Sequence, residues 1–142
     1  MEIWLDTANV DFVSYVNDLG VLQGVTTNPT ILSLSNICPQ ELLGELLNAQ
    51  NGLVAVQVLS DDVEEICKEA RILFALSNRI LVKIPATQNG VRAIYLLNQE
   101  GIRTLATAIF EPRQALLAFK AGANYLAPYL GRIADTGKNP ID

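Results

Sequence analysis

Histidine is absent from all 142 residues of the sequence. Its absence excludes every catalytic triad, dyad or proton shuttle that depends on an imidazole. It also disfavours a catalytic zinc site, because most such sites use histidine ligands. If the chain is an enzyme, its chemistry has to use lysine, carboxylate, hydroxyl and amide side chains.

Cysteine is scarce, with Cys38 and Cys67 far apart in the sequence. Their separation matches no metal-ligand spacing. We expect two reduced thiols in a cytoplasmic protein rather than a disulfide.

Long apolar runs and basic clusters are also missing. No stretch of about 18 apolar residues could span a membrane, and the N-terminus lacks the pattern of a signal peptide. The net charge is −5 without a basic run, which gives no support for binding to nucleic acid or to anionic lipid. Half of the residues are hydrophobic, and the length fits a single folded domain.

Short β-rich runs alternate with longer helical stretches. The strands read as nearly continuous apolar runs, the pattern of a parallel sheet covered on both faces. Gly20 is expected just past the end of the first helix, and Ser60 is expected as an N-cap. The expected strands are 3–5, 21–26, 53–58, 80–84, 103–109 and 124–130, and the expected helices are 9–19, 39–50, 61–76, 88–100 and 112–120.

This β-helix-β rhythm leaves an open doubly wound sheet or a barrel. Neither a G-x-G-x-x-G motif nor a Walker motif is present, so the sequence lacks the motifs typical of a nucleotide-binding open sheet. A closed barrel has eight strands and typically about 250 residues. We therefore expect residues 1–142 to form one incomplete (β/α)8-type TIM barrel domain that lacks the last two strands.

Polar residues interrupt the expected strands at their carboxyl ends, which form the active-site face of a βα barrel. Lys83 is the most specific of them, because it lies between apolar neighbours in Ile80 to Pro85. Such surroundings disfavour an ammonium ion, and a neutral amine can attack a carbonyl to form a Schiff base. An isolated lysine there would more commonly extend to water. The other rim residues are Asp6, Thr26, Thr27, Asn28, Gln57, Thr107, Tyr129 and Arg132.

Several of these residues have simpler interpretations. Asp6 could cap the first helix, and Asn28 could serve the turn before Pro29. Thr107 could be an ordinary strand threonine, Tyr129 a core tyrosine and Arg132 a surface residue. Gln57 is harder to explain in this way, because an amide inside an apolar strand needs hydrogen-bond partners.

Several segments together resemble the transaldolase family, and in particular its fructose-6-phosphate aldolase-like branch. They appear in the family's order and extend to about residue 132. Gly-Val-Thr-Thr-Asn-Pro-Thr (24–30) and Val-Lys-Ile-Pro-Ala-Thr (82–87) are the most specific. The others are Trp-Leu-Asp-Thr-Ala (4–8), Thr-Leu-Ala-Thr-Ala (104–108), and Ala-Gly-Ala (121–123) followed by Ala-Pro-Tyr (127–129).

The resemblance implies a (β/α)8 barrel and class I aldol chemistry on a sugar phosphate, without metal or cofactor. Lys83 resembles the Schiff-base lysine. Asp6 and Asn28, beside Thr26 and Thr27, look like the residues that hold substrate hydroxyls around the cleaved bond. The set Gln57, Thr107 and Tyr129 looks like the group that positions a catalytic water, and Arg132 looks like part of the phosphate-end contact.

Two positions bear on the subtype. Transaldolases carry Glu and Phe where this chain has Gln57 and Tyr129, so the pair is similar to the aldolase branch. Ala106, Phe110 and Gly131 depart mildly from that branch. The missing strands are the larger departure, because the last loops of a barrel commonly build its phosphate site.

Three hypotheses remain open at this stage. The chain is an aldolase or transaldolase completed by association, a truncated remnant without turnover, or another Schiff-base aldolase of the deoxyribose-phosphate type. The Thr-Thr-Asn-Pro segment disfavours the last. Six strands leave two unpaired edges, so we expect a homo-oligomer whose contacts involve an edge strand or residues 132–142.

Overall fold

The computed structural model describes residues 1–33 and 38–130. In these residues six strands alternate with helices. The strands are β1 (Ile3–Asp6), β2 (Leu22–Thr26), β3 (Leu53–Gln57), β4 (Ile80–Pro85), β5 (Thr104–Ile109) and β6 (Tyr125–Pro128). The helices are α1 (Val10–Asp18), α2 (Pro29–Ser33), α3 (Pro39–Ala49), α4 (Val63–Leu76), α5 (Gln88–Gln99) and α6 (Pro112–Lys120).

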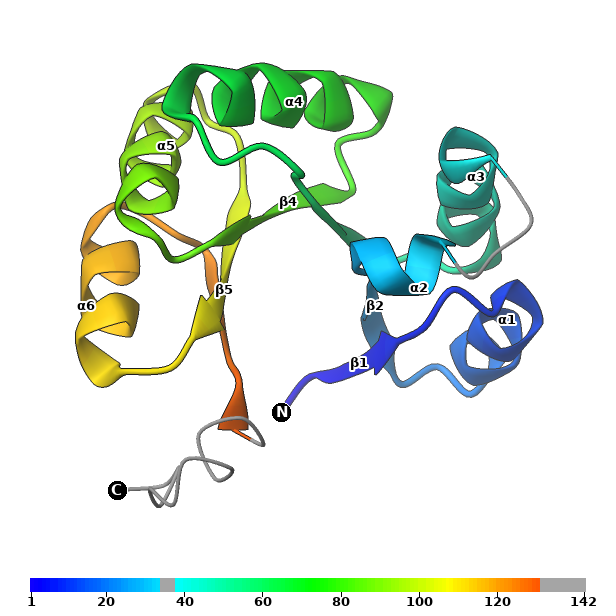
Figure 1. Cartoon of the computed structure of the whole chain (residues 1–142). Coiled ribbons are helices and arrows are strands. Elements are labelled where there is room, and N and C mark those ends of the chain that lie inside the picture. The colour runs from blue at the N-terminus through cyan, green and yellow to red at the C-terminus, as the bar shows by residue number, and fades with distance from the viewer. Residues whose placement is uncertain (34–37, 131–142) are drawn as a thin grey trace.

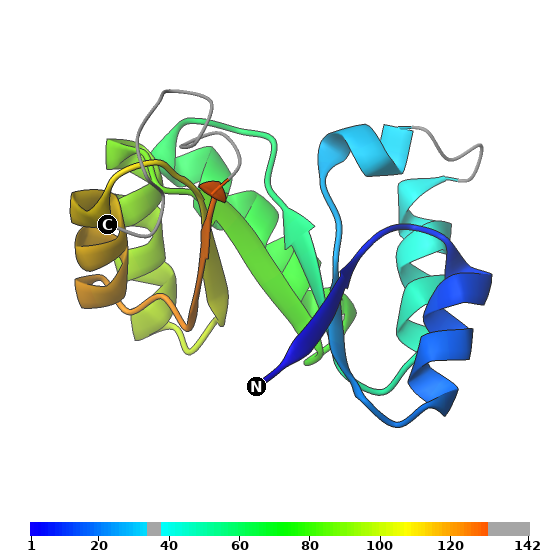
Figure 2. The ribbon, with the colours of Figure 1, turned by 90° about the horizontal axis from the view of Figure 1, so that it is seen from below.

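All neighbouring strands are parallel, in the order β1-β2-β3-β4-β5-β6. The sheet curls into an open half-barrel, with the strands inside and the main helices around its convex side (Figures 1 and 2). The expected incomplete TIM-type barrel is therefore confirmed. As expected, β1 and β6 are the two edges of the sheet.

Alternation along the strands divides the core into two parts. Val54, Val56 and Val82 point toward the helices and belong to the large core outside the sheet. Ala55, Leu81 and Leu105 form a smaller buried cluster on the concave side, together with Trp4 and Tyr125 among others. The continuous apolar runs in the sequence are explained by this burial on both faces.

The helices differ from the sequence prediction in two respects, the N-cap of α4 and the presence of α2. Gly20, with φ 71°, follows α1 as predicted. The predicted N-cap at Ser60 is wrong: Asp62 caps α4 by accepting hydrogen bonds from the amides of Glu64 and Glu65. The Ser60 hydroxyl instead donates to Glu69. The short helix α2 was not predicted, because five residues are too few for a periodic pattern.

The helices at the two ends of the sheet expose large apolar side chains. In α1, Tyr15 is 63% exposed, and in α6 Leu117 and Phe119 are 57% and 63% exposed. Such surface commonly marks a contact with another molecule. Among the helices that the structure describes, none has the length and apolarity needed to cross a membrane.

Candidate active site

Lys83 lies in β4 and is only 6% exposed. Its Nζ donates a hydrogen bond to the carbonyl oxygen of Thr27, at 3.1 Å. Among the described residues, no carboxylate lies within ion-pair distance of this amine. The site thus holds a buried, positioned amine.

The strand register places the other predicted strand residues on the same concave side. Asp6 pairs with Thr26, and Thr26 pairs with Ala55, two residues before Gln57. Gln57 pairs directly with Lys83. Because residues two apart on a strand share a face, these side chains gather at the carboxyl ends of neighbouring strands.

Two further pairings extend this row across the sheet. Lys83 pairs with Leu105 in β5, and Pro85 pairs with Thr107. The row therefore runs from β1 to β5 over the small inner core.

Asp6 and Asn28 flank the row with defined hydrogen bonds. The Thr26 hydroxyl donates to Asp6 Oδ1 at 2.8 Å, which fixes the carboxylate against β2. Asp6 does not cap α1, since Asn9 does so by accepting from the amide of Phe12. Asn28 Oδ1 accepts from the amide of Ile31 and thereby holds the first turn of α2.

Thr27 is fully buried, unlike the more exposed groups beside it. Both its amide and its hydroxyl donate to the carbonyl oxygen of Ala55, each at 2.9 Å. This arrangement fixes the peptide whose carbonyl receives Lys83. Thr27 is therefore placed to support the lysine, and its predicted contact with a substrate stays a prediction.

Thr107 is also fully buried, and within the described residues its hydroxyl has no hydrogen-bond partner. An unpaired buried hydroxyl is costly and commonly indicates a missing water or ligand. Gln57 is half-buried. Tyr129 is 36% exposed, so it is not a core tyrosine, and its ring meets Phe110 edge to face at 5.5 Å. The predicted Arg132 lies outside the described residues.

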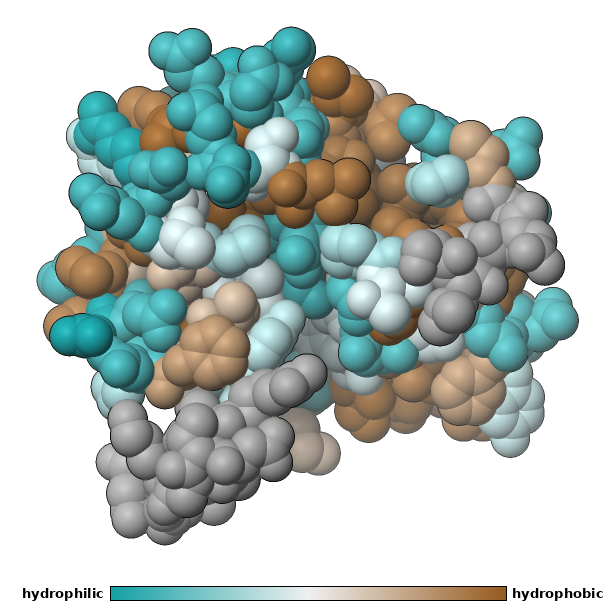
Figure 3. All heavy atoms as spheres, viewed as in Figure 1, coloured by the Kyte–Doolittle hydropathy of each residue, from teal (hydrophilic) through white to brown (hydrophobic). Residues whose placement is uncertain are grey.

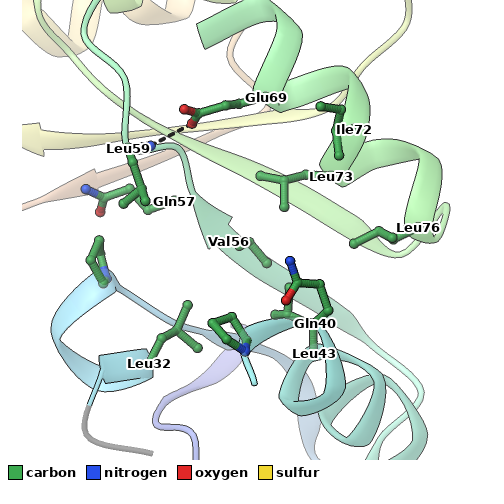
Figure 4. A pocket seen from close by; sticks show the side chains of 12 residues that line it. Leu32, Gln40, Leu43, Val56, Gln57, Leu59, Glu69, Ile72, Leu73 and Leu76 are labelled. Carbon is green, nitrogen blue, oxygen red and sulfur yellow. Dashed lines mark hydrogen bonds between the residues drawn. The ribbon is translucent and has the colours of Figure 1, made fainter. Parts of the chain in front are cut away.

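A separate apolar groove of about 420 Å³ lies between α3 and α4. Figure 4 shows Leu43, Leu73 and Leu76 lining it, while Glu69 binds the amide of Leu59. Brown surface marks this gap between α4 and α3 in Figure 3. Gln57 is the one predicted rim residue among those that line the groove, and Lys83 does not line it.

Cys67 is buried away from solvent and is not one of the rim residues. Cys67 lies in α4 and packs in the outer core. Burial raises the pKa of its thiol, and the nearby guanidinium of Arg71 offsets this only in part. The thiol is therefore a core side chain rather than a nucleophile.

Gln114 is a residue near the rim that the sequence analysis did not identify. Gln114, in the first turn of α6, makes four hydrogen bonds with backbone groups. Its Oε1 accepts from the amides of Phe110 and Glu111 at 2.9 and 3.1 Å. Its Nε2 donates to the carbonyl oxygens of Ala86 and Ala108 at 3.1 and 3.4 Å. The only signal in the sequence was a glutamine at the third position of a helix.

Comparisons with known proteins bear on the family of the chain. Residues 3–141 match the family described as Transaldolase/Fructose-6-phosphate aldolase. A "Probable transaldolase" of Petrotoga mobilis is 45% identical over all of this chain and 64% of its own length. Similar proteins of the same name from Coprothermobacter proteolyticus and Methanococcus maripaludis are each 42% identical, over 100% and 98% of this chain. The chain spans 64% to 65% of the length of these relatives.

Solved structures support the fold alone. The carboxyl transferase domain of Rhizobium etli pyruvate carboxylase, determined with pyruvate, has a TM-score of 0.59 at 15% identity. The match covers 98% of this chain and 32% of the pyruvate carboxylase chain. A second structure of the domain, with oxamate and biotin, has a TM-score of 0.57 at 14% identity. By its match over residues 3–141 and by its relatives, the chain belongs to the transaldolase/fructose-6-phosphate aldolase family.

Proposed function

We propose that this chain carries the Schiff-base chemistry of a class I aldolase or transaldolase that acts on ketose phosphates such as fructose 6-phosphate. The observation that carries the proposal is the position of Lys83 at the carboxyl end of a barrel strand, where its buried amine donates a hydrogen bond to the carbonyl of Thr27. A buried lysine amine at this rim is the kind of side chain that forms a Schiff base with a ketone.

The proposed reaction begins when the Lys83 amine adds to the ketone of the donor. Loss of water gives an iminium ion, which draws electrons from the neighbouring carbon–carbon bond. A hydroxyl proton passes to the Asp6 carboxylate, the bond breaks, and its electron pair forms an enamine on Lys83. The aldehyde half leaves, and Asn28 is the second group proposed to hold substrate hydroxyls.

The enamine can then react in two ways. A water held by Gln57, Thr107 and Tyr129 donates a proton to the enamine carbon, and hydrolysis of the new iminium releases dihydroxyacetone. Attack of the enamine on a second aldehyde instead gives transfer. The unpaired hydroxyl of Thr107 supports the water position. Arg132 is proposed for the phosphate end.

Borohydride trapping tests the role of Lys83. Reduction with dihydroxyacetone or fructose 6-phosphate should leave a three-carbon or six-carbon adduct at Lys83, which mass mapping locates. Lys83→Met should abolish the adduct, whereas the matched Lys68→Met, at an exposed helix position, should retain it. An adduct on Lys68 or Lys120 instead, or none on any lysine, contradicts the proposal and favours a chain without turnover.

Gln57 and Tyr129 favour the aldolase branch within this proposal. Fructose 6-phosphate should therefore release free dihydroxyacetone faster than its three-carbon unit passes to erythrose 4-phosphate. The double variant Gln57→Glu, Tyr129→Phe should reverse this preference, because it restores the pair found in transaldolases. Faster transfer than release by the unchanged chain would assign it to the transaldolase branch.

The proposal includes a second copy of the chain as partner, in the cytoplasm. The exposed apolar faces of α1 and α6 lie at the two edges of the sheet. A second copy that covers them would remove this apolar surface from water.

A further inference from the structure

The carboxyl ends of β4 and β5 are joined through one side chain that the proposed reaction does not use. Gln114 reaches back from α6 to the carbonyl of Ala86, 28 residues away in the sequence. It also reaches the carbonyl of Ala108, the residue that follows Thr107. Helix capping explains the two bonds accepted by its oxygen, but it does not explain the two bonds donated by its nitrogen.

The backbone at Ala108 shows why such a contact is needed. Ala108 has φ 53°, the only positive φ of a non-glycine residue in the described part of the chain. The register between β5 and β6 shifts at this point, between Ala106 and Ile109. Left-handed geometry is unfavourable for a residue with a Cβ and persists where neighbouring contacts hold it. Bulges of this kind re-aim side chains near active sites.

The contacts of Gln114 converge on Thr107. The amide of Ala86 donates to the Thr107 carbonyl at 2.8 Å, while the Ala86 carbonyl accepts from Gln114. The next carbonyl, that of Ala108, accepts from the same nitrogen. The Thr107 peptide is therefore fixed on both sides, and its unpaired hydroxyl is held at a set position relative to Lys83 on the adjacent strand.

We propose that Gln114 is a positioning residue for proton transfer: it clamps the bulge at Ala108 to the end of β4 and so places the Thr107 hydroxyl for the water that protonates the enamine. This inference rests on the proposed Schiff-base function. The hydrogen bonds of Gln114 all go to backbone groups, and it is not among the groups proposed to contact the substrate. Its effect passes through Thr107, and the partial reaction that depends on it is exchange of the carbon-bound hydrogens of dihydroxyacetone.

The test uses the full chain and dihydroxyacetone in D₂O, with deuterium incorporation followed by NMR. Gln114→Met keeps the length of the side chain and removes all four hydrogen bonds. It should leave borohydride trapping at Lys83 unchanged and slow the exchange about tenfold to a hundredfold, because small displacements in a site carry large rate costs. The matched control Asp62→Ala removes the N-cap of α4, a helix that follows β3 and not β5. It should weaken the fold without slowing exchange.

Gln114→Glu separates the donor role from the capping role. The ionised carboxylate still accepts from Phe110 and Glu111 but cannot donate to Ala86 or Ala108. Exchange should be slow at pH 7 and should recover relative to wild type as the pH falls and the new carboxyl gains a proton that it can donate. Exchange equal to wild type in Gln114→Met, or no recovery in Gln114→Glu, would overturn the inference.

The two proposals fail in different ways. If the unchanged chain forms no adduct at Lys83, the Schiff-base function is wrong, and the catalytic role of Gln114 is overturned with it. If trapping succeeds at Lys83 in every variant while exchange never responds to Gln114, only the positioning role is wrong. Amide hydrogen exchange at Phe110 and Glu111, faster in Gln114→Met, verifies that the clamp was removed.

Discussion

The rings of Trp4 and Tyr125 meet edge to face, with 5.4 Å between their centroids. They belong to β1 and β6, the two edges of the described sheet. Their contact joins the edges across the small inner core, so the concave side of the half-barrel is partly closed by its own side chains. Edge-to-face pairs contribute about 0.5–1.5 kcal/mol beyond the burial of their surface.

Gly24 is predicted to be essential to this contact. A Cβ at this position would lie 2.6 Å from both the carbonyl oxygen of Leu53 and the Trp4 ring. Because a backbone atom cannot move aside cheaply, Gly24→Ala should lower the free energy of unfolding by about 1–3 kcal/mol. Urea unfolding measures the change.

Gly44 provides the matched control for that substitution. It lies inside α3, and a Cβ there would meet nothing within 4 Å. Gly44→Ala should raise the free energy of unfolding by roughly 0.5–1 kcal/mol, because alanine restricts the unfolded chain. Equal effects at the two glycines would show that the Trp4 contact does not constrain β2.

The hydroxyl of Thr107 should lower the free energy of unfolding. Thr107→Val removes a buried hydroxyl without a partner among the described residues, and we expect a gain of about 1 kcal/mol in the free energy of unfolding. Thr27→Val removes a hydroxyl bonded to Ala55 and should lose about 1 kcal/mol. Thermal unfolding of both variants gives the comparison. A loss of stability in Thr107→Val would indicate that this hydroxyl is already paired with a bound water.

Glu100 should make stability depend on pH at the acidic end. It receives two hydrogen bonds from Arg71, at 2.8 and 2.7 Å. These bonds lower the pKa of Glu100 below its usual value of 4.5. The stabilisation is therefore complete above 4.5 and is lost as the pH falls through the lower pKa of the folded state.

Glu100→Gln tests this pH dependence. The substitution should lower the urea midpoint slightly at pH 7, and the difference from wild type should shrink as the pH drops below 4.5. Glu65→Gln, in an exposed pair with one 3.5 Å contact to Lys68, should change little. A difference that stays constant down to pH 2 would contradict the assignment to this ion pair.

Self-association should depend on the outer face of α6. Phe119 is 63% exposed there, and Phe119→Glu should shift the chain toward monomer in light scattering at micromolar concentration. Tyr95→Glu is the control, since Tyr95 is 46% exposed in α5, away from the edges, and packs under Arg92. A monomer that unfolds cooperatively without any substitution would show that no second copy is needed.

The sequence alone determined the alternation of strands and helices, because burial on both faces makes each strand a continuous apolar run. It also located Lys83, since a lysine inside such a run is chemically conspicuous. The start of α4 is not determined by the sequence, because Ser60, Asp61 and Asp62 are all good caps and only the structure shows which one accepts the free amides.

The tertiary structure decided the contacts that join distant segments. Gln114 has no special pattern around it, yet it binds Ala86 because β4 and β5 pair in parallel and bring the end of β4 beside the start of α6. Trp4 meets Tyr125 only because the same curl turns the two edges toward each other. Local sequence patterns report which face of an element is buried, whereas contacts over such separations depend on strand register and sheet curvature, which arise from the packing of the whole chain.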